Sequence, residues 1–373
     1  MHWRKIGTGI AIGFVLLAVI AVAGWQLLAD FFLRLYYETT YQPRRATMAD
    51  AKPAPLSWKL SNVPWIAADG PLCQSTSLQM IAAQHGHLQP RPAIDLLMSF
   101  TYGFMMRPGG NDLIPFGLDP EVGMRNAAPY LGLQRQYYVT DEPDVFIALA
   151  RSFIAQGYPV RVALDMGALY GSTEFIGHSN VLIGYDEEHF YLYETVCLPP
   201  APCQPGQLPA GEQGIKVSTQ QLLDAIASQA RTFQYPWRYN LTIFTPTEPA
   251  TDLRPVWQQL AQTILGASQY GPPSGVAALE QWIDEIEAGR VTPAQIQATM
   301  PLAARLRREN AAFLSERFAT EPTIAQAASQ LAAAATYYEQ AAAATEPVQI
   351  AALLRHAAAA ERAFGEAIRA YAP

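Results

Sequence analysis

The sequence predicts an α+β domain followed by an all-α helical bundle, with a transmembrane helix in front of both. Three observations lead to this prediction. A long run near the N-terminus carries no charge. Residues 56–247 mix short helical patterns with β-rich runs and Pro/Gly turns. Residues 248–373 contain no cysteine, have few β-branched runs and are rich in alanine, which is typical of a helical region.

The composition excludes several classes of protein. The chain has 373 residues, which is enough for about two domains. With 25 Lys and Arg against 32 Asp and Glu, its net charge of −7 argues against nucleic-acid binding, which needs a basic stripe. Three cysteines and six scattered histidines do not suggest a disulfide framework or a structural zinc site. We therefore predict no metal and no cofactor.

Residues 1–34 are predicted to be a membrane anchor or signal. Residues 10–23 carry no charge, and the apolar run over residues 7–29 is long enough to cross a bilayer of about 30 Å as a helix. Basic residues, among them Arg4 and Lys5, precede this run. The positive-inside rule then keeps the N-terminus in the cytoplasm and places the globular part outside the cell.

A cleaved signal peptide is the alternative, and it would make the protein secreted. Ala21–Ala23 would then be the signal-peptidase site. The apolar stretch continues past this site to Leu33, which favours an uncleaved anchor. Residues 35–55 contain several prolines and little periodicity, so we predict an extended linker there.

The stretch from Asp69 to Gly86 is predicted to place a cysteine at the start of a helix. Hydroxyl residues at 75–77 suit the helix start, and Gly86 suits its end. Cys73 then lies where unpaired backbone N–H groups and the helix dipole stabilise an anion. Beside a cationic histidine, the pKa of such a thiol falls from ~8.5 to as little as ~3.5–7.5. An inert buried cysteine is the alternative.

The stretch from Gly177 to Thr195 is predicted to be a β-hairpin. Ser179–Tyr185 and Phe190–Glu194 read as its two strands, joined by a turn. In an antiparallel hairpin the start of one strand meets the end of the next, so Glu194 lies near His178. Together with Cys73, these residues are therefore predicted to form a Cys–His–carboxylate triad.

Two further cysteines, Cys197 and Cys203, flank a proline-rich segment beyond the hairpin. In an exported protein they are candidates for a short disulfide. That pairing would leave Cys73 as a free thiol, which suits a nucleophile.

The alanine-rich residues 248–373 are predicted to form four or five helices. Large apolar side chains recur at three- to four-residue spacing, for example Val276, Leu279 and Ile286, and prolines separate the segments. No group of side chains in this region suggests chemistry, so we predict a packed bundle beside the first domain.

Two stretches of the sequence resemble known families. The Cys73 helix, the His178 strand and the Gly184–Asp186 turn resemble the papain-like domains of bacteriocin-processing (double-glycine-leader) cysteine peptidases over roughly residues 60–235. The stretches Gly275–Asp284 and Leu306–Glu316 are similar to the helical C-terminal half of butirosin biosynthesis protein H-like proteins, which include a thiol-dependent acyltransferase. The first resemblance implies a papain-like domain.

The resemblance to the peptidases also implies roles for individual residues. Cys73 would be the nucleophile and His178 the base, and Glu194 stands where the peptidases carry an aspartate. The peptidases hold a glutamine upstream of the cysteine that completes the oxyanion hole, and this sequence has none there. Asn62 and the backbone N–H of Cys73 or Gln74 could take its place.

These observations lead to two functional hypotheses. The first is a membrane-anchored, papain-like thiol enzyme whose Cys–His pair cleaves or transfers an acyl group, as a peptidase, amidase or acyltransferase. Its partners would be a peptide or small-molecule acyl substrate and the membrane, and not nucleic acid. The alternative is a non-catalytic cell-surface binding module that retains a papain-like cleft, which the missing upstream glutamine favours.

Overall fold

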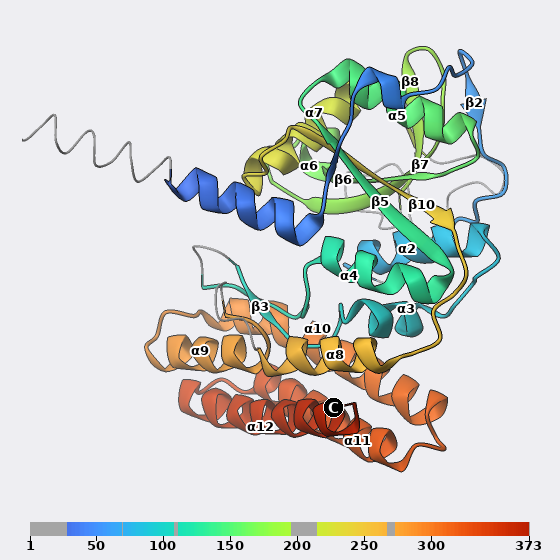
Figure 1. Cartoon of the computed structure of the whole chain (residues 1–373). Helices are drawn as coiled ribbons and strands as arrows, with labels where there is room; N and C mark the ends of the chain where they lie inside the picture. The colour runs from blue at the N-terminus through green and yellow to red at the C-terminus, as the bar shows by residue number, and fades with distance from the viewer. Residues whose placement is uncertain (1–27, 69, 108–110, 195–214, 267–272, 373) are drawn as a thin grey trace, which may run out of the picture.

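The computed structural model describes residues 28–68, 70–107, 111–194, 215–266 and 273–372. Figure 1 shows two packed parts, an upper part built around a sheet and a lower part of helices. The α+β class of the first part and the helical character of the second are those that the sequence predicts. Each part has its own apolar core.

The described residues form one eight-stranded sheet, in the order β1-β5-β10-β6-β7-β8-β9, with β2 pairing to β7. Only β1 and β5 run parallel, and the other pairs are antiparallel. The central strands β6 and β7 are buried along almost their whole length. The strands are β1 (Arg44–Arg45), β2 (Trp58–Lys59), β5 (Leu133–Thr140), β6 (Val160–Asp165), β7 (Gly177–Tyr185), β8 (His189–Tyr193), β9 (Ile215–Ser218) and β10 (Tyr239–Pro246).

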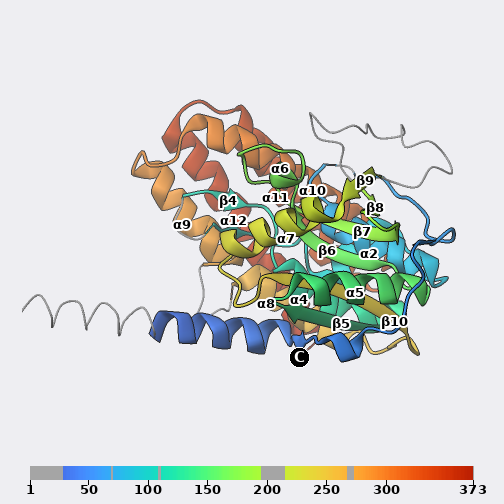
Figure 2. The same cartoon turned by 90° about the horizontal axis from the view of Figure 1, so that it is seen from above.

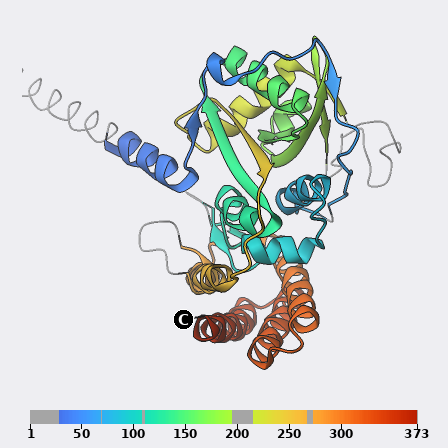
Figure 3. The same cartoon turned by 45° about the vertical axis from the view of Figure 1, so that its right-hand side comes forward.

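Helices cover the sheet, and Figure 2 shows α5 and α7 in front of it. Figure 3 shows α2, α3 and α4 between the sheet and the orange and red bundle. Side chains fix several helix starts. Asp119 accepts the N–H of Glu121 at 2.9 Å to cap α4, and Ser218 and Gln221 form a capping box on α7. The helices are α2 (Cys73–Gln84), α3 (Arg91–Met98), α4 (Pro120–Ala127), α5 (Pro143–Ala155), α6 (Met166–Leu169) and α7 (Thr219–Thr232).

The second part contains five helices among its described residues. Prolines stand at the first or second position of α8, α10, α11 and α12, where a missing N–H costs nothing. Small alanine side chains let α11 pack closely against both α10 and α12. The helices are α8 (Arg254–Leu265), α9 (Gly275–Glu287), α10 (Pro293–Arg317), α11 (Pro322–Ala343) and α12 (Pro347–Tyr371).

The two parts share a segment that the sequence assigns to the first domain alone. The short strands β3 (Met105–Met106) and β4 (Leu113–Ile114) form a separate two-stranded sheet. Tyr102 and Phe104, which precede β3, are fully buried in the core of the helical part. The hydrophobicity of Tyr102 and Phe104 predicts that they are buried. It does not predict that they are buried in the core of the helical part.

The C-terminal end of the N-terminal helix, residues 28–41, is hydrogen-bonded to the first part. The carbonyl oxygens of Thr40 and Tyr41 accept hydrogen bonds from Arg125 and Arg135 at 2.6 and 3.1 Å. These arginines satisfy the free carbonyls and match the negative end of the helix dipole. Tyr37 packs with Tyr41 in an aromatic cluster around Trp237.

Residues 35–55, predicted as an extended linker, therefore differ from that prediction. They contain the end of the helix, strand β1 and a 3₁₀ turn (Met48–Asp50), and they lie on the domain. The reason is the spacing of Tyr37 and Tyr41, which places both rings on one helix face. Most of the predicted anchor, residues 1–27, lies outside the described residues. In the described part of the chain no helix is long and apolar enough to span a membrane.

Candidate active site

Cys73 is the first residue of α2, and the local sequence leaves its surroundings rich in N–H donors. The residue before it, Leu72, offers no side-chain acceptor to the first turn. The helix ladder begins where Thr76 N–H donates to Leu72 O at 3.1 Å. The N–H groups of Cys73 and Gln74 therefore have no acceptor within the helix. The Cys73 side chain is a free thiol and is only 6% exposed.

His178 and Glu194 meet through strand pairing. His178 is the second residue of β7, and Glu194 directly follows β8, which pairs antiparallel with β7. His178 Nε2 lies 2.5 Å from Glu194 Oε1. Their side chains are 3% and 0% exposed. Water is excluded from this contact, which strengthens its electrostatics.

The His178 ring also hydrogen-bonds the Cys73 thiol. Glu194 already occupies Nε2, so Nδ1 is the ring nitrogen left for the sulfur. The backbone N–H of Ser179 is a second donor to the thiol. The structure thus brings Cys73, His178 and Glu194 into one row, although they come from a helix and from two strand ends.

The environment shifts both ionisable partners toward an ion pair. Burial raises the pKa of the Cys73 thiol, but the charge and hydrogen bond of His178 and the Ser179 N–H outweigh it. The net pKa of Cys73 therefore lies below its ordinary value. Burial lowers the pKa of His178, yet Cys73 and Glu194 together raise it to about 10. The arrangement favours a thiolate beside an imidazolium, which is the reactive state of a thiol nucleophile.

Two further side chains hold Glu194 in place. Asn180 donates to Glu194 Oε2 at 2.8 Å, and Trp65 Nε1 donates to the Glu194 backbone carbonyl at 2.9 Å. Asn180 is on the same face of β7 as His178, since strand side chains alternate. The side chains of His178 and Asn180 therefore both contact the Glu194 carboxylate.

We expect Asn180→Ala to weaken the site without removing it. The change leaves the fully buried Glu194 Oε2 without this donor, which costs about 1–3 kcal/mol and loosens the carboxylate that orients His178. The midpoint of chemical unfolding should fall, and alkylation of Cys73 by iodoacetamide at pH 6 should slow several-fold. Asn126→Ala is the control, because the side-chain hydrogen bond of Asn126 in the described structure goes to Gln259 at 3.3 Å, away from the site. Equal behaviour of the two variants would contradict the role of Asn180.

The two predicted oxyanion donors lie in different places. Gln74 is beside Cys73 in the first helical turn, and its side-chain oxygen accepts Arg161 Nη2 at 2.6 Å. Asn62 is exposed between β2 and α2. In the described part of the chain no hydrogen bond joins Asn62 to Cys73 or His178. The oxyanion role of both residues stays a prediction. The disulfide candidates Cys197 and Cys203 lie outside the described residues.

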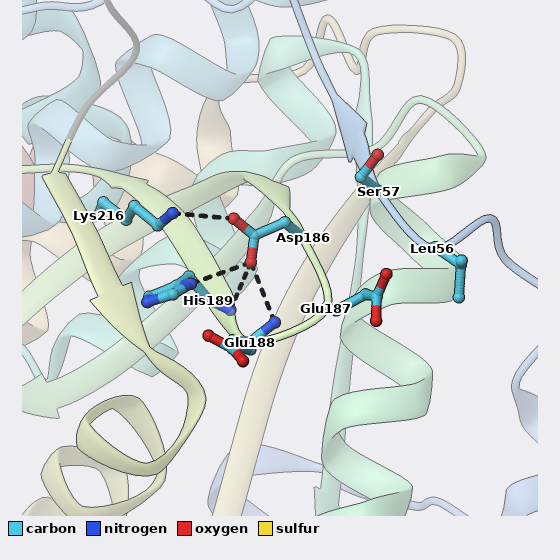
Figure 4. Close-up of a pocket in the computed structure, with 7 residues that line it drawn as sticks. All are labelled: Leu56, Ser57, Asp186, Glu187, Glu188, His189 and Lys216. Atoms are coloured by element: carbon cyan, nitrogen blue, oxygen red, sulfur yellow. Dashed lines mark hydrogen bonds and ion pairs between the residues drawn. The ribbon is translucent and has the colours of Figure 1, made fainter.

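A hollow of about 420 Å³ lies at the turn between β7 and β8 (Figure 4). Asp186 bonds Lys216 and His189 there, each at 3.0 Å. His178 stands at the opposite end of β7, some eight residues or roughly 26 Å of strand away. The hollow is therefore separate from the Cys73 arrangement. Its lining residues are Leu56, Ser57, Asp186, Glu187, Glu188, His189 and Lys216.

Sequence reasoning missed Trp65, Asn180 and Arg161. Asn180 could have been found from the two-residue period of the strand, which puts it on the face of His178. Arg161 has a different signal, because it is a lone charge in the otherwise apolar run from Val160 to Leu164. Nothing local to Trp65 points to Glu194.

No protein-family model and no curated protein sequence matches the chain. Among solved structures, a proposed C39-like peptidase from Bacillus anthracis matches at 14% identity with a TM-score of 0.34. The match covers 52% of this chain and 99% of that one. At this overlap the likeness supports no conclusion about function.

Proposed function

We propose that the protein is a papain-like thiol enzyme that attacks acyl groups through Cys73. The observation that carries this proposal is the buried row of Cys73, His178 and Glu194. It pairs a thiol of lowered pKa with an imidazole whose pKa is raised to about 10. A buried cysteine without a catalytic role needs neither partner.

The reaction would follow from this geometry. The Cys73 thiolate attacks the acyl carbon, and the negative oxygen that develops faces the N–H groups of the first turn of α2, which have no acceptor within the helix. The bond to the leaving group breaks as His178 gives it the proton from Nδ1. Water or an amine then attacks the thioester, His178 takes the incoming proton, and the C–S bond breaks to release the thiolate. Glu194 fixes the ring throughout.

The candidate activities differ in the molecule that takes the acyl group from Cys73. Transfer to water makes the protein a peptidase or amidase, and transfer to an amine makes it an acyltransferase. Both share the acyl-enzyme on Cys73. A non-catalytic binding module would form none.

An acyl-enzyme probe tests the proposal. The full chain is treated with an activated acyl ester, and the modified residue is located by peptide mass spectrometry, which separates Cys73 from Cys197 and Cys203. We expect an acyl adduct on Cys73 that turns over slowly and is absent in Cys73→Ala. In His178→Ala the adduct should form far more slowly. If Cys73 shows no adduct while the other cysteines do, the thiol enzyme is wrong and the binding module is favoured.

We also propose that the N-terminal segment anchors the enzyme in a membrane, with the globular part outside the cytoplasm. The apolar run over residues 7–29 supports this. So does the helix that continues it, whose exposed side chains at Leu28, Phe31 and Phe32 are apolar at helical spacing. These side chains are each more than half exposed, which suits contact with lipid.

Carbonate extraction of the full chain tests the anchor. We expect the wild type to stay with the membrane fraction, because an apolar helix is not released by high pH. Leu17→Arg combined with Val19→Arg places two charges in the apolar run and should move the protein to the supernatant. Leu88→Arg is the matched control at an exposed leucine of the globular part. Wild-type protein in the supernatant would refute the anchor.

A further inference from the structure

Behind the proposed active site lies a buried arginine that none of the expected catalytic roles uses. Arg161 is the second residue of β6, between β10 and β7, and is 1% exposed. Burying a guanidinium is costly unless every N–H finds an acceptor. Its three acceptors in the described structure are Ser179, Glu121 and Gln74.

Two of these acceptors are the sequence neighbours of the catalytic pair. Arg161 Nη2 donates to Gln74 Oε1 at 2.6 Å, directly after Cys73. Arg161 Nε donates to Ser179 Oγ at 2.9 Å, directly after His178. One planar fork thus holds the start of α2 and the start of β7 at once.

The contact through Ser179 continues into α2. Arginine can only donate hydrogen bonds, so the Ser179 hydroxyl accepts from Arg161 and its own proton is free for another acceptor. It donates this proton to Ser77 Oγ at 3.0 Å. Ser77 Oγ in turn donates to the Ser179 carbonyl oxygen at 3.2 Å. The backbone of Ser179 is therefore fixed against α2, and its N–H is the one that reaches the thiol.

The charge of Arg161 is held by Glu121, which Arg135 also contacts at 2.7 Å. Two buried cations thus share one carboxylate. Asp119, whose side chain caps α4, adds a further attraction to both arginines. Arg161 also has an attractive interaction with a charged Cys73.

We infer that Arg161 is a positioning residue for the proposed reaction, which sets the Cys73–His178 geometry by holding Gln74 and Ser179. This inference rests on the proposed function. Arg161 touches neither the acyl group nor the reacting sulfur through a hydrogen bond. Its effect reaches the thiolate through the Ser179 N–H and through its positive charge.

The test is the ratio of Cys73 alkylation rates at pH 6 and pH 9 in the full chain, measured with iodoacetamide and peptide mass spectrometry. Arg161→Met is expected to lower this ratio about tenfold, because less thiolate exists at pH 6 while both proteins react as thiolate at higher pH. Arg161→Lys keeps a charge but loses the fork, so its ratio should be intermediate.

Two further variants keep the test decisive. Gln74→Leu removes one contact of the fork and leaves the Arg161–Glu121 pair, so it should fold even if Arg161→Met does not, and its ratio should fall several-fold. Arg151→Met is the control, because Arg151 binds the Asp186 and Glu187 carbonyls at the far end of β7. Its ratio should equal that of the wild type.

The outcomes separate the two claims. A wild type with no reactive thiol at pH 6 overturns the proposed function. If the wild-type thiol is reactive, and the folded Arg161→Lys and Gln74→Leu variants have the wild-type ratio of alkylation rates, only the positioning role of Arg161 is overturned.

Discussion

Between pH 8 and pH 6, Cys73 is expected to lose much less of its rate of reaction with iodoacetamide than an ordinary thiol does, because its pKa is lowered. An ordinary thiol would lose roughly a hundredfold in rate over those two units, since each unit below its pKa costs a factor of ten. In this protein His178 and the Ser179 N–H stabilise the thiolate against the cost of burial. The measurement is the second-order rate of alkylation of Cys73, read by peptide mass spectrometry.

His178→Ala should remove this reactivity at pH 6. Burial would then act on the thiol without its main opposing charge, so the pKa of Cys73 would rise above its ordinary value. We expect the rate at pH 6 to fall by about a hundredfold or more, which corresponds to two units or more of pKa. His189→Ala is the control, because His189 pairs with Asp186 in the turn beyond the other end of β7. Equal rates for both variants would mean that His178 does not activate the thiol.

The same ion pair gives the protein a pH-dependent stability. The pKa of His178 is about 10 in the folded protein, above its ordinary value of 6.5. The folded state therefore binds this proton more tightly than the unfolded state. The contribution of His178 is complete below pH 6.5 and is lost as the pH rises through 10, whereas the contribution of Cys73, whose pKa is lowered, is lost as the pH falls. The ion pair therefore stabilises the fold most between these limits. Wild type should lose stability as the pH approaches 10, and His178→Ala should lose less.

The largest loss of stability is expected from Arg307→Met. Arg307 in α10 is fully buried and donates to Glu361 Oε1 at 2.7 Å. It also donates to the carbonyl oxygens of Thr101 at 2.7 Å and Gly103 at 2.5 Å, in the segment shared by the two parts. Removing it leaves a buried carboxylate and two buried carbonyls without this partner. Such a change costs about 3–5 kcal/mol.

Urea unfolding checks this expectation. The proteins compared are wild type, Arg307→Met, Arg308→Met and the double variant Arg307→Met/Glu361→Met. Arg307→Met combined with Glu361→Met should recover part of the loss, because the unpaired charge is removed with its partner. Arg308→Met is the matched control, since Arg308 is the next residue in α10 and pairs with Glu339 on the surface, where ion pairs contribute little. A loss for Arg307→Met no greater than for Arg308→Met would show that the buried contacts of Arg307 do not stabilise the fold.

Much of the candidate site was open to prediction because it depends on short-range rules. The helix that starts at Cys73 follows from the turn before it and the hydroxyl residues after it. The approach of Glu194 to His178 follows from hairpin pairing, which is fixed by the position of the turn. Asn180 belongs to the same group, because strand alternation alone places it on the face of His178.

Other features depend on contacts that no local pattern encodes. Ser77 and Ser179 are 102 residues apart in sequence and hydrogen-bond across α2 and β7. Tyr37 and Tyr41 fasten a segment that reads as a linker, because Trp237 and Tyr137 offer a matching aromatic surface far along the chain. Each helix or strand has an apolar face, but the sequence of one element does not say which other face will cover it.

The amino-acid sequence alone determined the two structural classes, the charge-free N-terminal run, the helix that begins at Cys73 and the hairpin that joins His178 to Glu194. These are consequences of composition, periodicity and chain connectivity. Only the tertiary structure decided that α2 abuts β7, that Arg161 holds both, and that Tyr102 and Phe104 belong to the helical core. Those contacts form because they bury apolar surface and pair buried charges over the whole molecule at once, and that balance is not contained in any single segment.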